Sequence, residues 1–236
     1  MRTFAYIFAL LLLSSPVLRA QTPGDNRPKA EAGKAQKAVA DTLGGGAARR
    51  AWHLSVGTDL AGAVLAAATA YGSLEGNLRL NLRETYFPTV EAGLGLSDHR
   101  NEETQIHYRT RSPYFRLGCD YNFLNDKTSG NRVFGGLRYG FSPFSYDVDG
   151  PALHDAVYHE DVPFSYKGLS AWSHWAEIVG GIEARVWGIL HLGWSVRYKL
   201  RISESTTTVG HAWYVPGYGK SGGSVMTGTF NVSIDI

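Results

Sequence analysis

The chain has 236 residues, enough for one large β domain or two smaller ones. Charged residues make up 19% of it, below the roughly 25% typical of soluble domains, and the formal charge is +2 with no cationic run, so we expect no nucleic-acid partner. The single cysteine, Cys119, excludes an intrachain disulfide and a cysteine zinc site.

The first 20 residues have the pattern of a signal peptide. Met1 and Arg2 form a short basic start, the apolar stretch FAYIFALLLLSSPVL follows, and Ala20 is the expected last residue before cleavage. An N-terminal transmembrane anchor is the alternative, but the apolar run is short for one. Residues 21–50 are rich in Ala, Gly, Lys and Pro, so we expect a flexible periplasmic leader, with residues 51–236 as the folded domain.

From residue 51 onward no stretch has a convincing helical period, whereas alternation of apolar and polar residues recurs eight times. The stretch LHLGWSVRYKLRIS shows it well, with Leu, Trp, Val, Tyr and Ile on one face and His, Gly, Ser, Arg and Lys on the other. Segments of period two predict an antiparallel all-β domain. The predicted strands are 52–60, 71–83, 86–96, 114–123, 132–144, 172–186, 190–203 and 226–236.

The connections between these segments alternate in length. In chain order they span roughly ten, two or three, seventeen, eight, twenty-seven, two or three, and twenty-two residues. This pattern is typical of an eight-stranded up-and-down transmembrane barrel with short periplasmic turns, long extracellular loops and both termini on the short-turn side. A further hairpin within residues 145–171 would make ten strands instead.

Alternation alone does not say which face points outward, and a soluble lipocalin-like binder would show it too. Two features of the polar face favour the membrane arrangement. The face is rich in glycine, which leaves room for long side chains in a narrow barrel, and it carries both charges in near balance, as a buried ion-pair network requires. The predicted interior network consists of Glu75, Arg79, Glu91, Arg116, Asp120, Arg138, Glu177, Glu183, Arg185, Arg197, Lys199 and Arg201.

The apolar face has the features of a lipid-facing surface. Its segments of about nine to eleven residues match a tilted transmembrane strand. Aromatic residues gather toward the strand ends, as two interfacial belts would require. They are Trp52, Phe87, Phe123 and Trp187 on the short-turn side and Tyr71, Phe141, Phe144, Trp172 and Tyr198 near the long loops. We therefore expect outer-membrane lipids and the barrel-assembly machinery as partners, although the chain ends on Ile236 where such barrels generally end on an aromatic residue.

Three stretches carry a resemblance to a known family. They are GGLRYGFSPFSYDVDGP (residues 135–151), the pair of strands from WSHWAEIVGGIEARVW to LHLGWSVRYKLRIS, and WYVPGYGKSGG (residues 213–223). Together they resemble an uncharacterised family of small exported bacterial proteins regarded as outer-membrane β-barrels. The resemblance covers most of residues 52–236 and implies a fold and a location in the outer membrane. It implies no activity and no catalytic residues.

No residue is predicted to be catalytic or to bind a cofactor or metal ion. His154 and His159 lie among carboxylates in the longest connection, but their spacing is not that of a known site, so we interpret this segment as an ordinary polar loop. The alternative function is a lipid-modifying hydrolase or acyltransferase. It would use His174, with Ser173 and Glu177 close in sequence.

The last long connection crowds Trp213, Tyr214 and Tyr218 around a Pro-Gly turn. Two arrangements fit these residues, an exposed binding surface or a cap folded onto the barrel, and we favour the cap. Eight strands enclose an interior just wide enough for side chains, so we expect the charged network to plug the lumen. We thus expect a monomeric, non-enzymatic barrel in the outer membrane of a Gram-negative envelope. Its role would be structural, or it would bind an extracellular ligand through its long loops.

Overall fold

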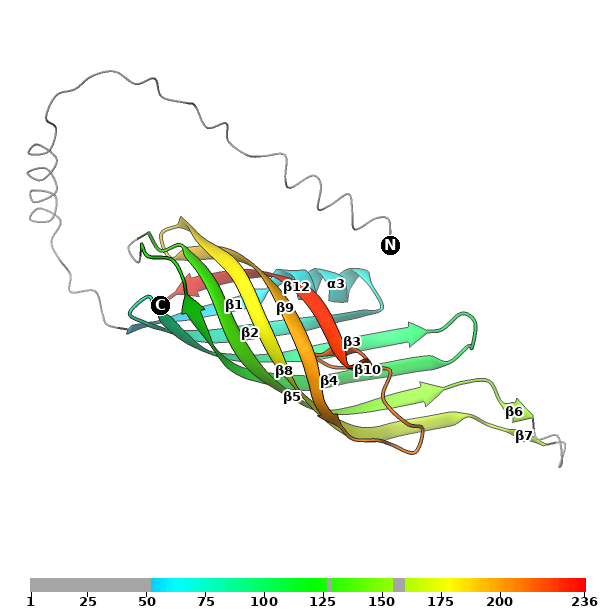
Figure 1. The fold of residues 1–236 in the computed structure, drawn as a ribbon. Coiled ribbons are helices and arrows are strands. Elements are labelled where there is room, and N and C mark those ends of the chain that lie inside the picture. Colours follow the sequence, from blue (N-terminus) through cyan, green and yellow to red (C-terminus); the bar gives the residue numbers. More distant parts are fainter. Residues whose placement is uncertain (1–51, 127–128, 155–159) are drawn as a thin grey trace, which may run out of the picture. The chain divides into compact units, whose positions relative to one another are not determined.

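The computed structural model describes residues 52–126, 129–154 and 160–236. The predicted signal peptide and leader lie outside the described residues, and so does His159. Eight long strands close into one ring in the order β1, β12, β9, β8, β5, β4, β3, β2, with antiparallel neighbours throughout (Figure 1). The predicted eight-stranded up-and-down barrel is confirmed. The strands are β1 (Trp52–Asp59), β2 (Tyr71–Leu82), β3 (Tyr86–Arg100), β4 (His107–Asn122), β5 (Arg132–Asp149), β8 (Ser165–Trp187), β9 (Leu190–Glu204) and β12 (Ser224–Asp235).

The two faces of the barrel wall differ in polarity. Along β9, Ser195, Arg197 and Lys199 are buried inside, whereas Trp194 and Val196, which alternate with them, are about half exposed outside. The same alternation runs around the ring, so the outer surface is apolar and the interior is polar. A soluble barrel has the opposite polarity, because water drives its apolar side chains inward. This barrel therefore has the polarity of a membrane-spanning one.

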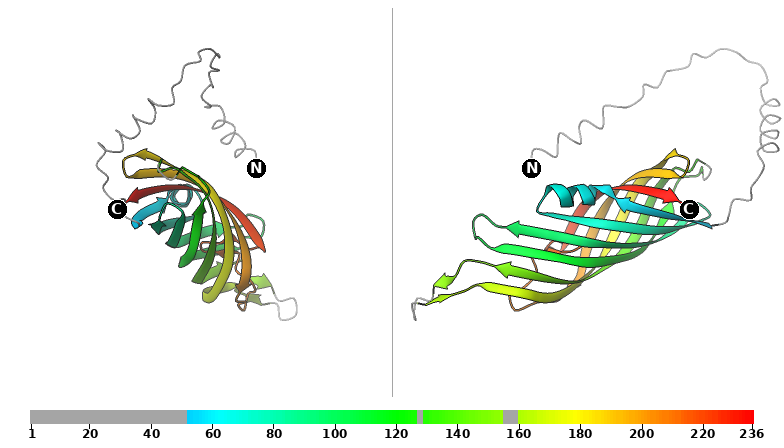
Figure 2. Two further views of the ribbon diagram at one scale, coloured as in Figure 1. Left: turned by 60° about the vertical axis from the view of Figure 1, so that its left-hand side comes forward. Right: turned by 180° about the vertical axis from the view of Figure 1, so that it is seen from behind.

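Several strands are longer than a bilayer requires. β8 has 23 residues and β5 has 18, whereas a tilted transmembrane strand needs about 9–11. The excess lies on the side of the long connections, where β5 and β8 project beyond their neighbours (Figures 1 and 2). For the same reason the connection between β3 and β4 is residues 101–106, much shorter than predicted, because both strands continue past their predicted ends.

Two small hairpins lie outside the ring. One, β6 (Leu153–His154) with β7 (Asp161–Val162), sits at the tip of the long β5–β8 connection. The other, β10 (Tyr214–Val215) with β11 (Gly219–Lys220), belongs to the connection between β9 and β12. Neither pairs with a barrel strand, so the ten-stranded alternative is wrong.

A short helix that the sequence did not predict, α3 (Leu60–Ala68), follows β1 directly. The Asp59 carboxylate caps it by accepting hydrogen bonds from the backbone N–H groups of Ala61 (3.0 Å) and Gly62 (3.1 Å). The helix reads LAGAVLAAA, which has no polar face, so no amphipathic period marks it in the sequence. Of the residues that the structure describes, none lie in a helix long and apolar enough to cross a membrane.

The interior holds a charged layer and, toward the long connections, an aromatic layer. Two residues of the predicted belts belong inside, because Phe87 and Phe144 share the inward phase of their strands. The Arg132 guanidinium lies over the Phe87 ring, 4.5 Å from its centroid. The other predicted belt residues are exposed. The aromatic layer includes Tyr108, Tyr114, Phe144, Tyr146, Trp175, Tyr214 and Tyr218.

Candidate functional site

Glu91 lies at the centre of the charged interior. Its carboxylate accepts hydrogen bonds from Arg116 Nη1 (2.9 Å), Arg138 Nε (3.0 Å) and Arg197 Nη1 (2.6 Å). These three arginines come from β4, β5 and β9, so their side chains meet across the lumen. All four side chains are at most 4% exposed. One carboxylate thus ties together strands from different sides of the barrel.

Two further carboxylates extend this cluster. Glu75 accepts from the Tyr114 hydroxyl at 2.7 Å and from Arg116 Nη1 at 2.6 Å. Glu177 accepts from the Trp175 indole N–H at 2.6 Å, and its Oε1 lies 3.0 Å from Arg116 Nε. Tyr114 and Trp175 were not predicted as members of the network. The sequence could have indicated them, because each is an aromatic residue at a position where its strand otherwise carries inward-facing polar residues.

A second group of ion pairs lies nearer the short turns. Glu183 accepts from Arg79 Nη1 at 3.0 Å and from Arg132 Nη2 at 2.6 Å. Asp120 accepts from Arg138 through two nitrogens, at 2.6 and 3.0 Å. Arg132 was missing from the predicted network, although it shares the inward phase of β5 with Arg138. Buried charges are very costly unless they are paired, so these contacts keep the polar interior stable.

Two residues of the predicted network are placed elsewhere. Arg185 is exposed, because β8 becomes irregular between Arg185 and Trp187 where the barrel wall ends. Arg201 is only partly buried and forms its ion pair with Glu204 at the end of β9. Arg201 therefore does not join the carboxylates of the interior network. The remaining ten predicted residues are buried inside.

The connection between β9 and β12, residues 205–223, folds into the barrel mouth, and we name it the cap loop. Tyr214 is 6% exposed and Tyr218 is completely buried, so these two do not form an exposed binding surface. The Gly217 carbonyl accepts from Arg116 Nη2 (2.9 Å) and Lys199 Nζ (2.7 Å), which joins the loop to the charged cluster. Trp213 is only partly buried.

The groups of the alternative enzymatic function do not converge. His174 lies on the outer face, where its Nδ1 is 2.7 Å from the Tyr139 hydroxyl. Ser173 and Glu177 point inward, on the opposite face of the same strand. Ser221 sits in the stretch GKSGG, which has the letters of a hydrolase nucleophile turn, but it follows a two-residue strand and no helix follows it.

The described part of the chain contains no cluster of three or more residues that could hold a metal ion. In the longest connection, His154 Nδ1 lies 3.0 Å from Asp161 Oδ1, and both side chains are exposed.

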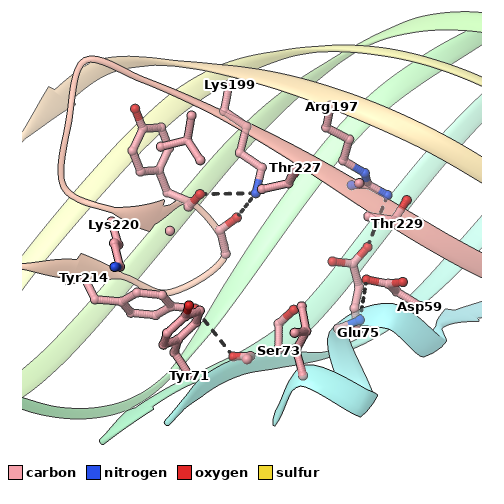
Figure 3. Close-up of a pocket in the computed structure, with 18 of the residues that line it drawn as sticks. Asp59, Tyr71, Ser73, Glu75, Arg197, Lys199, Tyr214, Lys220, Thr227 and Thr229 are labelled. Atoms are coloured by element: carbon pink, nitrogen blue, oxygen red, sulfur yellow. Dashed lines mark hydrogen bonds and ion pairs between the residues drawn. The ribbon is translucent and has the colours of Figure 1, made fainter. Parts of the chain in front are cut away.

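Two of the cavities among the described residues lie toward the long connections. The first, of about 320 Å³, lies between the cap loop, α3, β2 and β12 and is lined by Arg197, Lys199 and Tyr214 among others (Figure 3). The second, of about 360 Å³, lies near the tips of the strands on the side of the long connections, and we name it the outer pocket. It is lined by His99, Asn101, Thr104, Ile106, Tyr108, Tyr146, Val148, Phe164, Val209, His211 and Trp213.

Comparison with known proteins gives a family and one solved structure. No curated protein matches the chain. The crystal structure of a major outer membrane protein from Thermus thermophilus is similar with a TM-score of 0.43 and 14% identity, over 79% of this chain and 100% of that one. The family described as "Domain of unknown function (DUF6048)" matches residues 2–236, and the chain belongs to this family.

Proposed function

We propose that the protein is a monomeric, non-enzymatic barrel of the outer membrane that is closed to solutes and binds a ligand at the cell surface. The observation that carries this proposal is the position of the outer pocket on strands that extend beyond the bilayer, above an interior filled by ion pairs and the cap loop. A filled lumen is unsuited to conduction, whereas a pocket at the extracellular tips is accessible to a ligand.

The outer pocket has the chemistry to bind a saccharide ring. Trp213 and His99 stack in parallel, with ring centroids 4.6 Å apart and planes within 4°. Tyr108 packs against the same Trp213 ring at 5.8 Å. Aromatic rings offer flat apolar faces to the C–H groups of a sugar, while Asn101 and Thr104 on the pocket wall offer hydrogen bonds to its hydroxyls. We infer that the surface ligand is a soluble saccharide.

The location is tested by separating the membranes of cells that express the full chain. We expect the protein in the outer-membrane fraction, with an apparent mass in unboiled gel samples that differs from the boiled form, because a closed barrel resists detergent. Recovery in the soluble periplasmic fraction would exclude the membrane barrel and favour the lipocalin-like alternative.

Ligand binding is tested with the purified barrel on an array of soluble saccharides. We expect binding that falls about tenfold or more in Trp213→Ala, because that ring forms one wall of the pocket. Trp187→Ala is the matched control, since Trp187 is 82% exposed at the opposite end of the barrel. Equal binding by both variants, or none by the parent protein, would contradict the proposed saccharide site.

A further inference from the structure

The barrel wall is incomplete between β2 and β12. β1 pairs with β12 only from Ser55 to Asp59, opposite Asp235 to Asn231. β12 itself begins at Ser224 and is paired with β9 from that residue on. Residues 224–230 of β12 therefore have no strand partner on the β1 side. We name this gap the wall notch, and α3 lies beside it, packed against β2 and β12 (Figures 1 and 2).

Asp59 creates the notch. Besides capping α3, its Oδ1 accepts the backbone N–H of Phe230 at 3.1 Å, the first group of β12 beyond the last β1 pair. One carboxylate thus ends the strand, starts the helix and satisfies the adjacent edge of β12. The strand is stopped by a specific contact at this position.

The notch faces lipid. α3 contains no charged or polar side chain, and Leu60, Val64 and Leu65 are 40–64% exposed. A helix of this composition is stable with those side chains in the hydrocarbon or at its interface, and Met226 on β12 is likewise 71% exposed. The opening between α3 and β12 therefore leads sideways into the membrane.

The cavity of about 320 Å³ lies directly inside the notch (Figure 3). Leu65 and Gly228 line it toward the lipid side, whereas Lys199, Val225 and Thr227 line it toward the lumen. Its volume is at the small end of the range of about 300–1,000 Å³ for ligand sites. This size excludes a lipid with several chains inside the cavity and suits a head group with one chain.

The cavity offers cationic groups that form no direct ion pair. Lys199 Nζ donates to the carbonyls of Gly217 (2.7 Å) and Tyr218 (3.2 Å), and it forms no ion pair with any described carboxylate. Lys220 likewise lies over the rings of Tyr71 and Trp213 without such a pair among the described residues. An ammonium has three donors, so Lys199 keeps one for a ligand.

The other polar groups of the cavity support this assignment. Thr227 lies beside the Lys199 ammonium in Figure 3, and its hydroxyl oxygen is buried without a hydrogen-bond partner among the described residues. The two carboxylates that line the cavity are already engaged, Asp59 by backbone N–H groups and Glu75 by Arg116 and Arg197. The groups left available are cations and a hydroxyl, which favour an anionic partner.

We propose that the wall notch admits a single-chain amphiphile with a carboxylate head, a fatty-acid-type anion, from the outer leaflet. The carboxylate binds Lys199 and Thr227, and the chain passes between Leu65 and Gly228 to lie along α3 and β12 in the membrane. The site is separate from the outer pocket, so it does not depend on the proposed saccharide.

Photolabelling of the mature barrel in phosphatidylcholine nanodiscs tests the site. The probes are palmitate with a diazirine at the end of its chain and the hexadecanol analogue with the same group. We expect palmitate to label peptides of residues 60–68 and 224–230, and the alcohol to label them about tenfold less, because it lacks the charge that binds Lys199. Equal labelling by the two probes would overturn the proposal.

Two variants separate the head-group site from the entrance. Lys199→Gln is expected to reduce palmitate labelling about tenfold, whereas the exposed Lys167→Gln leaves it unchanged. Gly228→Trp is expected to block labelling while keeping both cations. Gly76→Trp is its control, since a side chain at either glycine meets open space. Labelling that persists in Gly228→Trp would show that the chain does not pass through the notch.

A photoreactive residue placed at Met226 identifies any other occupant. We expect this residue to crosslink to labelled palmitate, and an excess of unlabelled palmitate to reduce the yield of the crosslink. Crosslinks to a second copy of the barrel, or to residues 21–50 of the same chain, would instead show a protein segment in the notch and would overturn the lipid proposal.

Discussion

At the scale of single residues, the interior is organised by carboxylates that each serve several cations. Glu91 is the clearest case, because three guanidinium groups share its two oxygens. Arg138 continues from Glu91 to Asp120, and Arg116 continues to Glu75 and Glu177. In a dry interior such shared contacts couple their members, so the loss of one group leaves several others unpaired.

Glu91→Gln should therefore destabilise the barrel far more than an ordinary surface change. Removing the charge leaves Arg116, Arg138 and Arg197 with a deficit of negative charge in a buried site, and we expect a cost of about 3–5 kcal/mol in the free energy of unfolding. The measurement is the unfolding transition in urea, followed by the gel shift between folded and unfolded forms. Glu102→Gln, in an exposed connection, is the control. Identical transitions for the two variants would argue against a stabilising network.

The sequence predicts which charged residues face the interior, but it does not predict which of them form ion pairs with one another. Period two places Glu75, Arg116 and Arg197 on one face of their strands whatever the rest of the fold does. That Arg197 on β9 reaches Glu91 on β3 depends on how the closed ring brings distant strands across the lumen. The failure at Arg185 has a similar cause, since alternation does not show where the wall ends.

At the scale of elements, α3 is the feature that the sequence hid. Its residues are small and apolar, so they satisfy no helical pattern and read as a loop between two strands. The helix fits only because Gly72 on β2 has no side chain. A Cβ at Gly72 would lie 2.3 Å from the backbone of Ala66, which is closer than atoms can approach.

Gly72→Val should thus displace α3 from the wall while leaving the ring of strands intact. We expect the amide protons of residues 60–68 to exchange with solvent about tenfold faster or more, because the helix loses its packing surface. Gly76→Val on the same strand is the matched control, as a side chain there meets open space. If the amide protons of α3 exchange at the same rate in both variants, the close packing at Gly72 is not what holds the helix against the wall.

At the scale of the whole molecule, two joined layers of side chains lie across the barrel interior. The cap loop fills the mouth with Tyr214, Val215 and Tyr218, and the ion-pair cluster around Glu91 spans the lumen beneath it. They are joined at Gly217, whose carbonyl accepts from Arg116 and Lys199. The sequence indicated both layers, the cap by its crowded aromatic residues and the buried charged cluster by the balanced charges of the polar face. Their junction depends on three-dimensional contacts that alternation does not encode.

Two layers imply that opening the barrel requires two changes. In planar bilayers we expect no conductance from the parent barrel and little from a variant in which residues 206–222 are replaced by a short Gly-Ser turn, because the ion pairs still cross the lumen. Adding Glu91→Ala and Arg197→Ala should produce discrete channels, since these substitutions remove the long side chains that bridge the interior at 2.6 Å. A gel shift between unboiled and boiled samples confirms that each variant is folded. Conductance from the loop replacement alone would show that the cap loop by itself closes the barrel. No conductance from a folded barrel that carries the loop replacement, Glu91→Ala and Arg197→Ala would show that the remaining arginines are enough to block the lumen.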